Sequence, residues 1–417
     1  MPGCLSFKID GNESNEMSMD RFDLIIAGAG PTGAALACAL APWFKRIAIV
    51  DAQPPYTDDD GRTDPRTLAL ANTSARILAG LGVWRQISAL ANPICDVRLF
   101  AAGAATETRM DGHDQHFGAL GFTVSAHALT TILHERLRAT AIQWYAPHRI
   151  KGVAIEDEGA RVALDDGDTL RGRLLVAADG SRSLIREALG IVSRDTDYHQ
   201  QAVLAELVTA TPAKQTAFEV LTAGGPLALL PNYGRWSMVW VQGQAEAEAL
   251  MTLNNAALIA RIQEQLGGRV EITQVANRYH YPLHQVQAWT LTGERTALLG
   301  NAAHTVHPVG AQGLNLGLRD VATLAELLVQ AVRAGVDPGD PGLLDQYARR
   351  RSADHYRVLA VTDSLAHLLG ESTHPLRPWL GTGLNLLRAL PPLQRGLIRL
   401  GVGGFDATTR LGRGLPL

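Results

Sequence analysis

The chain has 417 residues, of which 46% are hydrophobic and 19% are charged, and its formal net charge is −3. This length supports two or three structural units that each bury a core. Because no strong basic excess is present to neutralise phosphates, we expect no nucleic-acid partner. The cysteines, Cys4, Cys38 and Cys95, are spaced for neither a disulfide framework nor a zinc site, which indicates a reducing, cytoplasmic compartment and no bound metal.

The N-terminal residues 1–20 are polar and lack the apolar segment of a secretion signal, so we expect a disordered extension there. The sequence contains no run of about 18 or more apolar residues, the length that crosses a bilayer. We therefore expect a protein that is dissolved in the cytoplasm or is at most attached to the surface of the inner membrane.

Residues 21–196 carry the pattern of a Rossmann-like α/β unit. Residues 22–27 and 46–50 are short apolar runs, typical of parallel strands that are covered on both faces. Helices are expected at 34–40, 72–81 and 126–139, and a β-meander at 150–177 that ends in a strand over 174–178.

The pattern changes after residue 196. Short β-prone runs surround one helical stretch, which predicts an antiparallel sheet inserted into the first unit as a substrate-binding domain. The α/β unit then resumes and ends in long helices and a tail. The expected segments are the inserted domain at 197–290 with its helical stretch near 247–266, the second part of the first unit at 291–370 with a strand at 296–299 and helices at 313–335 and 341–369, and the tail at 371–417.

A glycine motif, GAGPTG at residues 28–33, lies between the first strand and the first helix. Gly28 allows a tight turn, Gly30 lets a pyrophosphate approach the backbone, and Gly33 lets the helix pack closely on the strand. Asp51 ends the second strand, where an acidic residue binds ribose hydroxyls. The combination predicts a dinucleotide site, but this motif alone does not separate FAD from NAD.

A second motif, LLVAADGSRS at residues 174–183, is an apolar strand that ends in Asp179 and Gly180. A basic helix start follows it, which suits a second contact with the nucleotide. The dipeptide Asp-Gly is also common in ordinary turns, so the motif is weak by itself.

The third motif, ALLGNAAHTVHPVGAQGLNLGLRDV at residues 297–321, is the most specific. A strand runs into a loop rich in glycine and proline, and a helix opens at Gly313. Such a loop brings backbone N–H groups close to a flat, electron-accepting ring, and the helix N-terminus stabilises negative charge on that ring. The alternative is a glycine-rich connector.

In this order and spacing, the three motifs resemble the group A flavin-dependent aromatic hydroxylases of the para-hydroxybenzoate hydroxylase type. The runs at 225–231 (GPLALLP), 307–321 and 362–365 (TDSL) further resemble the ubiquinone-biosynthesis hydroxylases, most closely the UbiH subgroup, the 2-octaprenyl-6-methoxyphenol hydroxylases. The resemblance covers about residues 21–400. It implies a Rossmann-like FAD-binding domain with an inserted antiparallel β-sheet substrate domain and C-terminal helices.

The resemblance also implies a reaction. NAD(P)H would bind transiently and reduce FAD, O₂ would then react with the flavin, and one oxygen atom would be transferred to the ring of a polyprenyl phenol. No second glycine motif follows a strand to form a separate NAD(P)H domain, which agrees with a transient reductant. The family further implies other ubiquinone-biosynthesis proteins as partners.

Residue roles carry over from the family position by position. Asp179 and Gly180 correspond to residues that touch FAD and the pyridine nucleotide, and Arg66, in the run PRTLAL, to one that contacts the flavin region. Asn301 stands where most relatives have an aspartate that holds the ribitol chain; asparagine keeps an acceptor oxygen and adds a donor. His307 and Pro308 are the catalytic candidates in the flavin loop. The expected FAD contacts are Gly28, Gly30, Pro31, Gly33, Asp51, Arg66, Asp179, Gly180, Asn301, Pro308, Gly310, Gln312, Gly313 and Asn315.

Three histidines and two tryptophans each allow two interpretations. The histidines His127, His304 and His307 either move protons near the flavin or are structural donors, and Trp236 and Trp240 either line an aromatic pocket or belong to the core.

The tail at 371–417 holds six arginines and two acidic residues in an amphipathic pattern, which suits either a membrane surface or partner, or closure of the core. For the whole chain, the alternatives are a flavoprotein of the same fold that acts on another aromatic or prenyl substrate, and a structural flavoprotein subunit of a quinone-biosynthesis complex.

Overall fold

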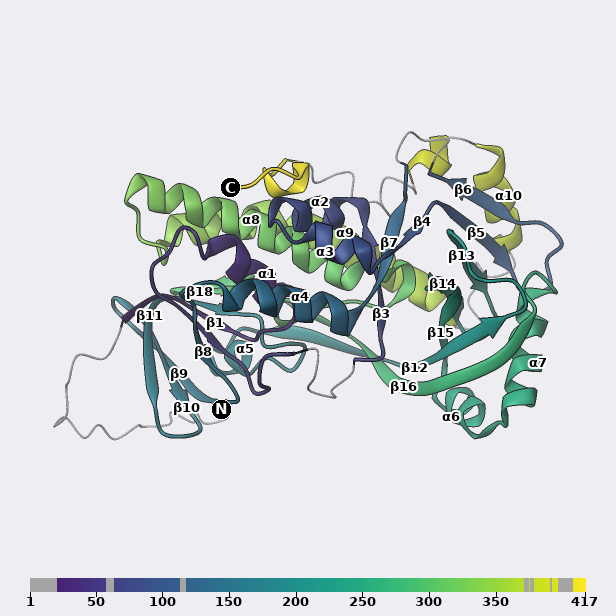
Figure 1. Cartoon of the computed structure of the whole chain (residues 1–417), viewed down its shortest axis with the longest axis horizontal. Helices are drawn as coiled ribbons and strands as arrows, with labels where there is room; N and C mark the ends of the chain where they lie inside the picture. Colours follow the sequence, from purple (N-terminus) through teal and green to yellow (C-terminus); the bar gives the residue numbers. More distant parts are fainter. Residues whose placement is uncertain are drawn as a thin grey trace.

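The computed structural model describes residues 21–57, 64–112, 118–370, 375, 379–390, 392–396 and 408–417. The expected disordered extension at 1–20 and much of the expected tail lie outside this part of the chain. Figure 1 shows an elongated molecule in which a body of mixed helices and strands is joined to a second body built on a large sheet.

The first body is organised around a mainly parallel sheet. Its central strand β1 (Arg21–Ala27) pairs in parallel with β2 (Ile47–Val50) on one side and with β11 (Thr169–Ala177) on the other. Every residue of β2 and the last four of β1 are buried, as expected for strands covered on both faces. The strand order is β17 (Thr292–Gly293), β18 (Thr296–Leu298), β11, β1, β2 and β8 (Gln143–Tyr145), with the antiparallel strands β9 (Ile150–Glu156) and β10 (Gly159–Leu164) attached to β11.

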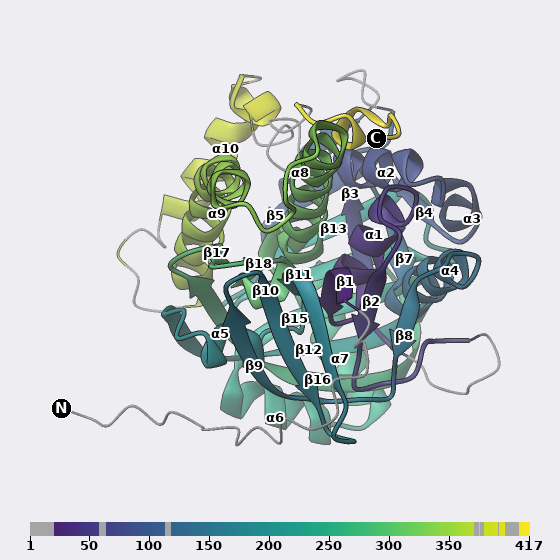
Figure 2. The same cartoon turned by 90° about the vertical axis from the view of Figure 1, so that its left-hand side faces the viewer.

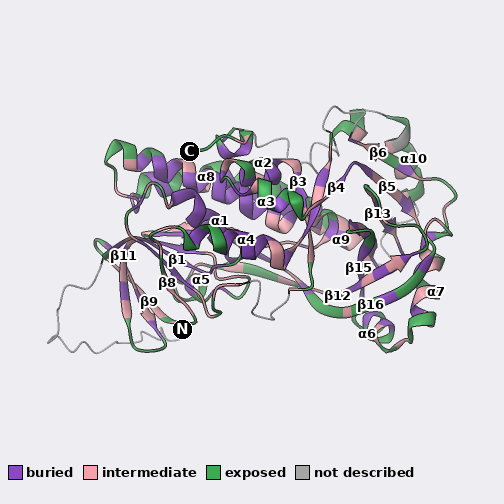
Figure 3. Cartoon of the chain, in the orientation of Figure 1, coloured by how far each residue is buried: buried purple, intermediate pink, exposed green. Residues whose placement is uncertain are grey.

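Helices cover one face of this sheet, and the β9–β10 hairpin lies on the other side (Figures 1 and 2). The short helix α1 (Pro31–Leu40) consists mostly of small apolar residues and contacts two other helices of the layer, α4 (Ala126–Arg138) and α8 (Gln312–Ala334). The long helix α9 (Pro341–Gly370) packs on α8. The burial of α1 and α8 (Figure 3) shows that the core of the first body lies between this layer and the sheet.

The second body is an eight-stranded sheet whose two longest strands, β12 (Ser193–Thr209) and β16 (Ile272–Ala288), pair antiparallel and extend back toward the first body. One face packs against α6 (Gln244–Thr252) and α7 (Asn255–Leu266), two helices where one helical stretch was expected. Trp236 and Trp240 are buried in the core on this face, so they are core residues. The order is β19 (His304–Thr305), β16, β12, β15 (Arg235–Gly243), β14 (Pro226–Asn232), β13 (Thr216–Leu221), β5 (Asp96–Ala101) and β6 (Thr108–Asp111).

Strands β5 and β6 come from the first segment of the chain, yet they join the second sheet, where β5 pairs in parallel with β13. A small third sheet connects the two bodies. It consists of β3 (Thr67–Ala71), β7 (Gly121–Ser125) and β4 (Asn92–Ile94), and it contacts β14 on one side and α8 on the other. The first body also holds the helices α2 (Asn72–Gly80), α3 (Trp84–Ala89) and α5 (Leu184–Ala188).

Two parts of the C-terminal segment are described. Helix α10 (Leu380–Ala389) lies against β5 and β6, and the Thr108 hydroxyl donates to the Leu384 carbonyl at 3.2 Å. Residues 408–417 pack on α2 and α8, with Leu411 only 1% exposed in the core of the first body. The end of the chain therefore closes that core. In the described part of the chain, no helix is both long enough and apolar enough to span a membrane.

Candidate flavin site

The glycine motif forms a tight junction between β1, α1 and β11. Gly28 has φ +102°, and a Cβ there would lie 2.2 Å from the carbonyl oxygen of Ala178. A Cβ on Gly33 would lie 1.9 Å from the carbonyl oxygen of Gly28. Neither position has room for a side chain, so both glycines are required by packing.

Gly30 differs from its two neighbours because it is exposed and is the N-cap of α1. A Cβ at Gly30 would meet no described atom within 4 Å, and no side chain from the described residues caps the helix. Pro31 occupies the first turn, where its missing N–H has no cost. The start of this helix is therefore open beside Gly30, and the partial positive charge of the helix N-terminus suits a pyrophosphate there.

Asp51 ends β2 and fixes the glycine loop. Its Oδ2 accepts the N–H of Ala29 at 2.6 Å and its Oδ1 accepts the N–H of Gln53 at 2.7 Å. Each carboxylate oxygen keeps a further lone pair, so a ribose contact stays a prediction. His134, which the motif analysis did not single out, lies behind the same loop: Nε2 is 2.7 Å from the Ala29 carbonyl oxygen, and Nδ1 accepts the N–H of Tyr56 at 2.9 Å.

Asp179 carries a buried oxygen that fits a ligand donor. Its Oδ2 accepts the N–H of Ile185 at 3.3 Å, whereas Oδ1 is buried and has no hydrogen-bond partner among the described residues. Burial raises the pKa of this carboxyl group. Gly180 follows with φ +91°. An unpaired buried carboxylate oxygen beside the glycine loop is what a contact with a nucleotide would satisfy.

The three motifs meet in space, as the resemblance implied. Gly28 touches Ala178 of the second motif, and a Cβ on Gly300 would lie 2.9 Å from the Thr32 hydroxyl oxygen of the first. The Arg186 guanidinium, which follows the second motif, donates to the Ala302 carbonyl of the third at 2.8 Å. These contacts bring the three motifs together, and their joint contact with one cofactor stays a prediction.

The flavin loop of the third motif, residues 306–311 between β19 and α8, contains strained backbone just before α8. Gly310 has φ 70°, and Ala311, with φ 50°, adopts a left-handed conformation that is uncommon for residues other than glycine. Gln312 is buried and donates from Nε2 to the Gly310 carbonyl at 2.9 Å, and Gly313 is half-buried. Asn301 lies exposed in a single 3₁₀ turn, Gly300–Ala302. A left-handed backbone at a residue other than glycine, as at Ala311, persists only where the surroundings enforce it, and such strain is concentrated at ligand sites.

Asn315 positions this loop. Its Oδ1 accepts the N–H of Ala71 at 2.8 Å and the Ser74 hydroxyl at 2.7 Å, and its Nδ2 donates to the carbonyls of Ala69 at 2.9 Å and Ala311 at 2.7 Å. These four bonds use the whole capacity of the amide. The Asn315 side chain therefore ties α8 to β3, and a contact between the Asn315 backbone and the cofactor stays a prediction.

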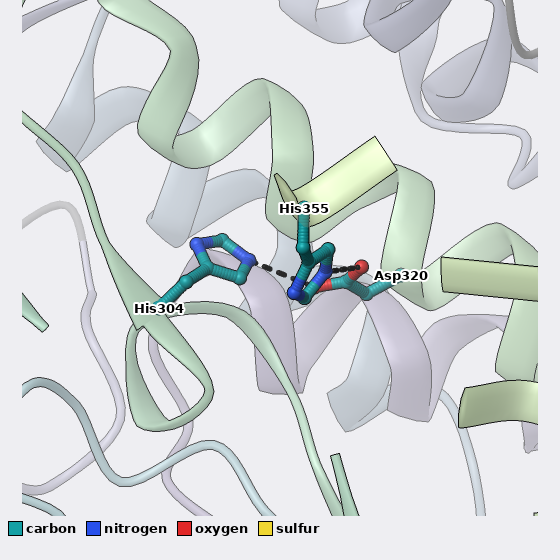
Figure 4. Close-up of side chains that lie close together, drawn as sticks. All are labelled: His304, Asp320 and His355. Carbon is teal, nitrogen blue, oxygen red and sulfur yellow. Dashed lines mark hydrogen bonds and ion pairs between the residues drawn. The ribbon is translucent and has the colours of Figure 1, made fainter. Parts of the chain in front are cut away.

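His304 is part of a buried charge network centred on Asp320 of α8 (Figure 4). Asp320 accepts His304 Nε2 at 2.9 Å and the Gly300 N–H at 3.4 Å on Oδ2, and His355 Nε2 and Arg351 Nε, both at 2.7 Å, on Oδ1. Burial opposes ionisation of Asp320, but His355 and Arg351 hold its pKa well below the usual 3.8. Burial and the neighbouring His355 lower the pKa of His304 to about 4.

Three atoms of His304, Asp320 and His355 lie within 4.8 Å of one another, a spacing that metal ligands share. However, the Arg351 guanidinium already donates to the same carboxylate and supplies the positive charge there. We therefore assign the cluster to holding the Gly300–Ala302 turn in place on α8 and α9. His304 acts there as a structural donor.

His307 is buried, and its Nδ1 accepts the N–H of Val309 at 3.2 Å while Nε2 faces Gln200 Oε1 at 3.3 Å. Burial lowers the pKa of His307 to about 4, so the ring is neutral at pH 7. This geometry shapes the loop at Pro308, which is half-buried; a direct catalytic role for either residue stays a prediction. His127, the third histidine, packs edge-on against Tyr56 with ring centroids 5.2 Å apart.

Arg66 stands at the start of β3, where its guanidinium pairs with Asp64, with Nε 2.8 Å from Oδ1. Arg66 lines a cavity of about 190 Å³ together with residues of the second sheet. The lining includes Asp64, Arg66, Leu204, Glu206, Ser237 and Asn277. Because β3 also carries Ala69 and Ala71, which Asn315 binds, this cavity lies along the same strand as the flavin loop.

Comparison with known proteins identifies the family. A family model described as an FAD binding domain matches residues 21–362. The chain belongs to this FAD-binding family. Ubiquinone hydroxylase UbiL of Rhodospirillum rubrum is 34% identical over 401 residues, covering 95% of this chain and 93% of UbiL. The 3-demethoxyubiquinol 3-hydroxylase of Escherichia coli is 28% identical over 91% of this chain and 98% of its own length.

Solved structures of the same fold agree with this assignment. The p-nitrophenol 4-monooxygenase PnpA from Pseudomonas putida superposes with a TM-score of 0.76 at 19% identity, covering 94% of this chain and 100% of PnpA. The HpxO protein of Klebsiella pneumoniae, solved with FAD, gives a TM-score of 0.72 at 17% identity, covering 91% of this chain and 98% of HpxO. The resemblance and the fold expected from the sequence are thus confirmed: the FAD-binding family member is an FAD-dependent monooxygenase related to the ubiquinone hydroxylases.

Proposed function

We propose that this monooxygenase hydroxylates the ring of a polyprenyl phenol in ubiquinone biosynthesis, in a reaction of the 2-octaprenyl-6-methoxyphenol type. Relatives named as ubiquinone hydroxylases support the substrate class. The observation that carries the proposal is the cavity beside Arg66, which combines polar groups with an apolar face of the second sheet.

The two kinds of lining suit the two parts of such a substrate. Leu204 lines the cavity and belongs to an apolar cluster with Ala202, Val241 and Leu283 on the sheet face opposite α6 and α7. An apolar chain would lie favourably on this surface, since burial contributes about 25 cal/mol per Å². The polar end at Arg66 and Glu206 would receive the oxygenated ring.

FAD, when bound and reduced, would supply the activation of O₂, and O₂ is the source of the oxygen atom that is transferred to the ring. The chain would hold the pyrophosphate at the Gly30 end of α1 and the ribitol at Asn301, and the N-terminus of α8 would stabilise negative charge on the ring edge. We further propose NAD(P)H as the transient reductant, with Asp179 as one of its contacts.

The proposal is tested with the FAD-loaded enzyme, NADH or NADPH, and a soluble 2-methoxy-6-alkylphenol. Formation of a ring-hydroxylated product, identified by mass spectrometry with ¹⁸O₂ as the oxygen source, is the expected result. Deletion of the gene should in parallel cause a quinone precursor that lacks one hydroxyl to accumulate. Reductant oxidation that yields only hydrogen peroxide with every phenol, together with normal ubiquinone in the deletion strain, would refute the proposal.

A further inference from the structure

Glu206 is a carboxylate of the cavity wall that is held at both oxygens by residues distant in sequence. Glu206 of β12 lines the cavity with a side chain that is 24% exposed. Its Oε1 accepts from Arg235 at 2.9 Å and its Oε2 accepts from the Asn277 amide at 3.0 Å. A carboxylate held in this way has lone pairs left to accept a hydrogen bond from a ligand.

A backbone irregularity aims Asn277 at this carboxylate. Along β12 the register advances two residues, from Leu204 to Glu206, while along β16 it advances three, from Tyr279 to Ala276. The extra residue makes a β-bulge, in which Asn277 has a left-handed φ of 51°. Bulges redirect side chains and are common beside active sites. A strained conformation in the cavity wall therefore points to a requirement for the Asn277 amide.

The neighbouring residue points to the opposite face of the sheet. Arg278 turns away from the cavity and donates to the Leu253 carbonyl and to Asn255, between α6 and α7. Asn277 and Arg278, adjacent in sequence, thus serve the cavity and the helical face of the sheet respectively. Without the bulge, the strict alternation of a strand would change the side of every residue beyond it.

The charges around the cavity are already balanced. Glu206 is matched by Arg235, and Asp64 is matched by Arg66. No cation among the described lining residues is left to neutralise a carboxylate on the ring of a ligand. Such a cavity favours a neutral ring that donates hydrogen bonds, because a ring carboxylate would lose hydration without gaining a partner.

We propose that Glu206 binds the substrate through its ring hydroxyl, accepting the phenolic hydrogen, and that Asn277 is a positioning residue for Glu206. This assignment rests on the proposed function. It makes the cavity selective for neutral phenols over phenols that carry a ring carboxylate.

The test uses the FAD-loaded protein and titrates two soluble probes, a 2-methoxy-6-alkylphenol and 4-hydroxybenzoate, following the flavin absorbance. The wild type should bind the neutral phenol at least about tenfold more tightly than the benzoate. Glu206→Gln should weaken phenol binding and raise the KM about ten- to hundredfold, because a hydrogen bond to a charged group is lost. The FAD content and the melting temperature should stay unchanged.

Two further variants separate binding from structure. Glu264→Gln, which removes an exposed partner of Arg261 on α7, is the matched control and should leave the affinity unchanged. Asn277→Gly keeps the left-handed backbone accessible but removes the amide, so it should weaken phenol binding about three- to tenfold without loss of stability.

Two outcomes overturn the assignment in distinguishable ways. If the wild type hydroxylates the phenol and Glu206→Gln binds it within twofold of the wild type, Glu206 is not the binding group although the proposed function stands. If the wild type hydroxylates no phenol, the proposed function fails, and the assignment fails with it.

Discussion

Replacement of Asp320 by asparagine tests how the buried network supports the flavin loop. Asp320 is fully buried and accepts four donors, from Gly300, His304, Arg351 and His355. Asparagine has nearly the same shape but no charge, and its NH₂ group would face at least one of these donors. The substitution therefore removes the counter-charge of Arg351 and creates a donor–donor contact at a site without solvent.

The expected loss follows from the burial of the pair. Removing one partner of a buried ion pair lowers the free energy of unfolding by about 3–5 kcal/mol, since the remaining charge stays desolvated. Asp354 keeps one contact with Arg351, at 2.7 Å, so we expect the lower part of this range, about 3 kcal/mol. The Gly300–Ala302 turn would also lose its anchor, and FAD affinity should fall.

The assay is urea unfolding of the FAD-loaded and the FAD-free protein, together with FAD release measured by fluorescence. Asp345→Asn on α9 is the control, because Asp345 pairs with Arg349 with its side chain 57% exposed, and exposed pairs contribute at most about 1 kcal/mol. If Asp320→Asn unfolds within about 1 kcal/mol of the wild type and keeps its FAD, the network does not support the loop and our reasoning is wrong.

Three other predictions follow from the structure. The pKa of His304 and of His307 is about 4, below the ordinary 6.5, so between these values the folded state keeps both rings neutral while the unfolded chain takes up protons. The free energy of unfolding should therefore be highest above pH 6.5 and should fall toward pH 4, by about 3 kcal/mol per histidine. Chemical unfolding at a series of pH values checks this slope. Asn301→Asp should preserve or tighten FAD binding, because the family resemblance implies an aspartate that holds the ribitol chain at this position. Complete loss of flavin in equilibrium dialysis would mean that the Asn301 amide donates a hydrogen bond to the flavin. Leu411→Ala should lower the free energy of unfolding by about 2–5 kcal/mol, because Leu411 is 1% exposed. The control Leu415→Ala should have a small effect, because Leu415 is 44% exposed. Equal effects of the two variants in chemical denaturation would contradict the closure of the core by residues 408–417.

Local patterns in the sequence predicted the elements near the cofactor well. The strands around the glycine motif and the two long helices were predicted within a few residues, because buried strands and amphipathic helices have distinct periods. Gly28 was predicted to allow a tight turn and Gly33 to allow close packing; Gly28 has φ +102°, and a Cβ on Gly33 would lie 1.9 Å from the Gly28 carbonyl oxygen. Each of these features depends on neighbours in the sequence.

Features that depend on distant partners were not predictable. Asn315 lies in the recognised motif, but its partners Ala69 and Ala71 are more than 240 positions away, so its structural role was invisible. The same holds for Asp320 and His355, and for the pairing of β5 with β13. The spacing of apolar residues shows which side of a helix or strand is buried, but it does not show which other element covers that side.

The paired long strands β12 and β16 connect the flavin loop to the wall of the substrate cavity. One end of this ribbon carries β19, where Gln287 and Val286 pair with His304 and Thr305, and the bulge at Asn277 lies farther along β16. The separation between the flavin loop and the substrate wall therefore depends on the register of this hydrogen-bonded ladder, including its shift between Asp197 and Gln201. Side chains along β12 and β16 can change to admit a different ring while the distance between the flavin loop and the substrate wall stays the same. An insertion or deletion in only one of the two strands would instead shift their register and displace the flavin loop relative to the substrate wall.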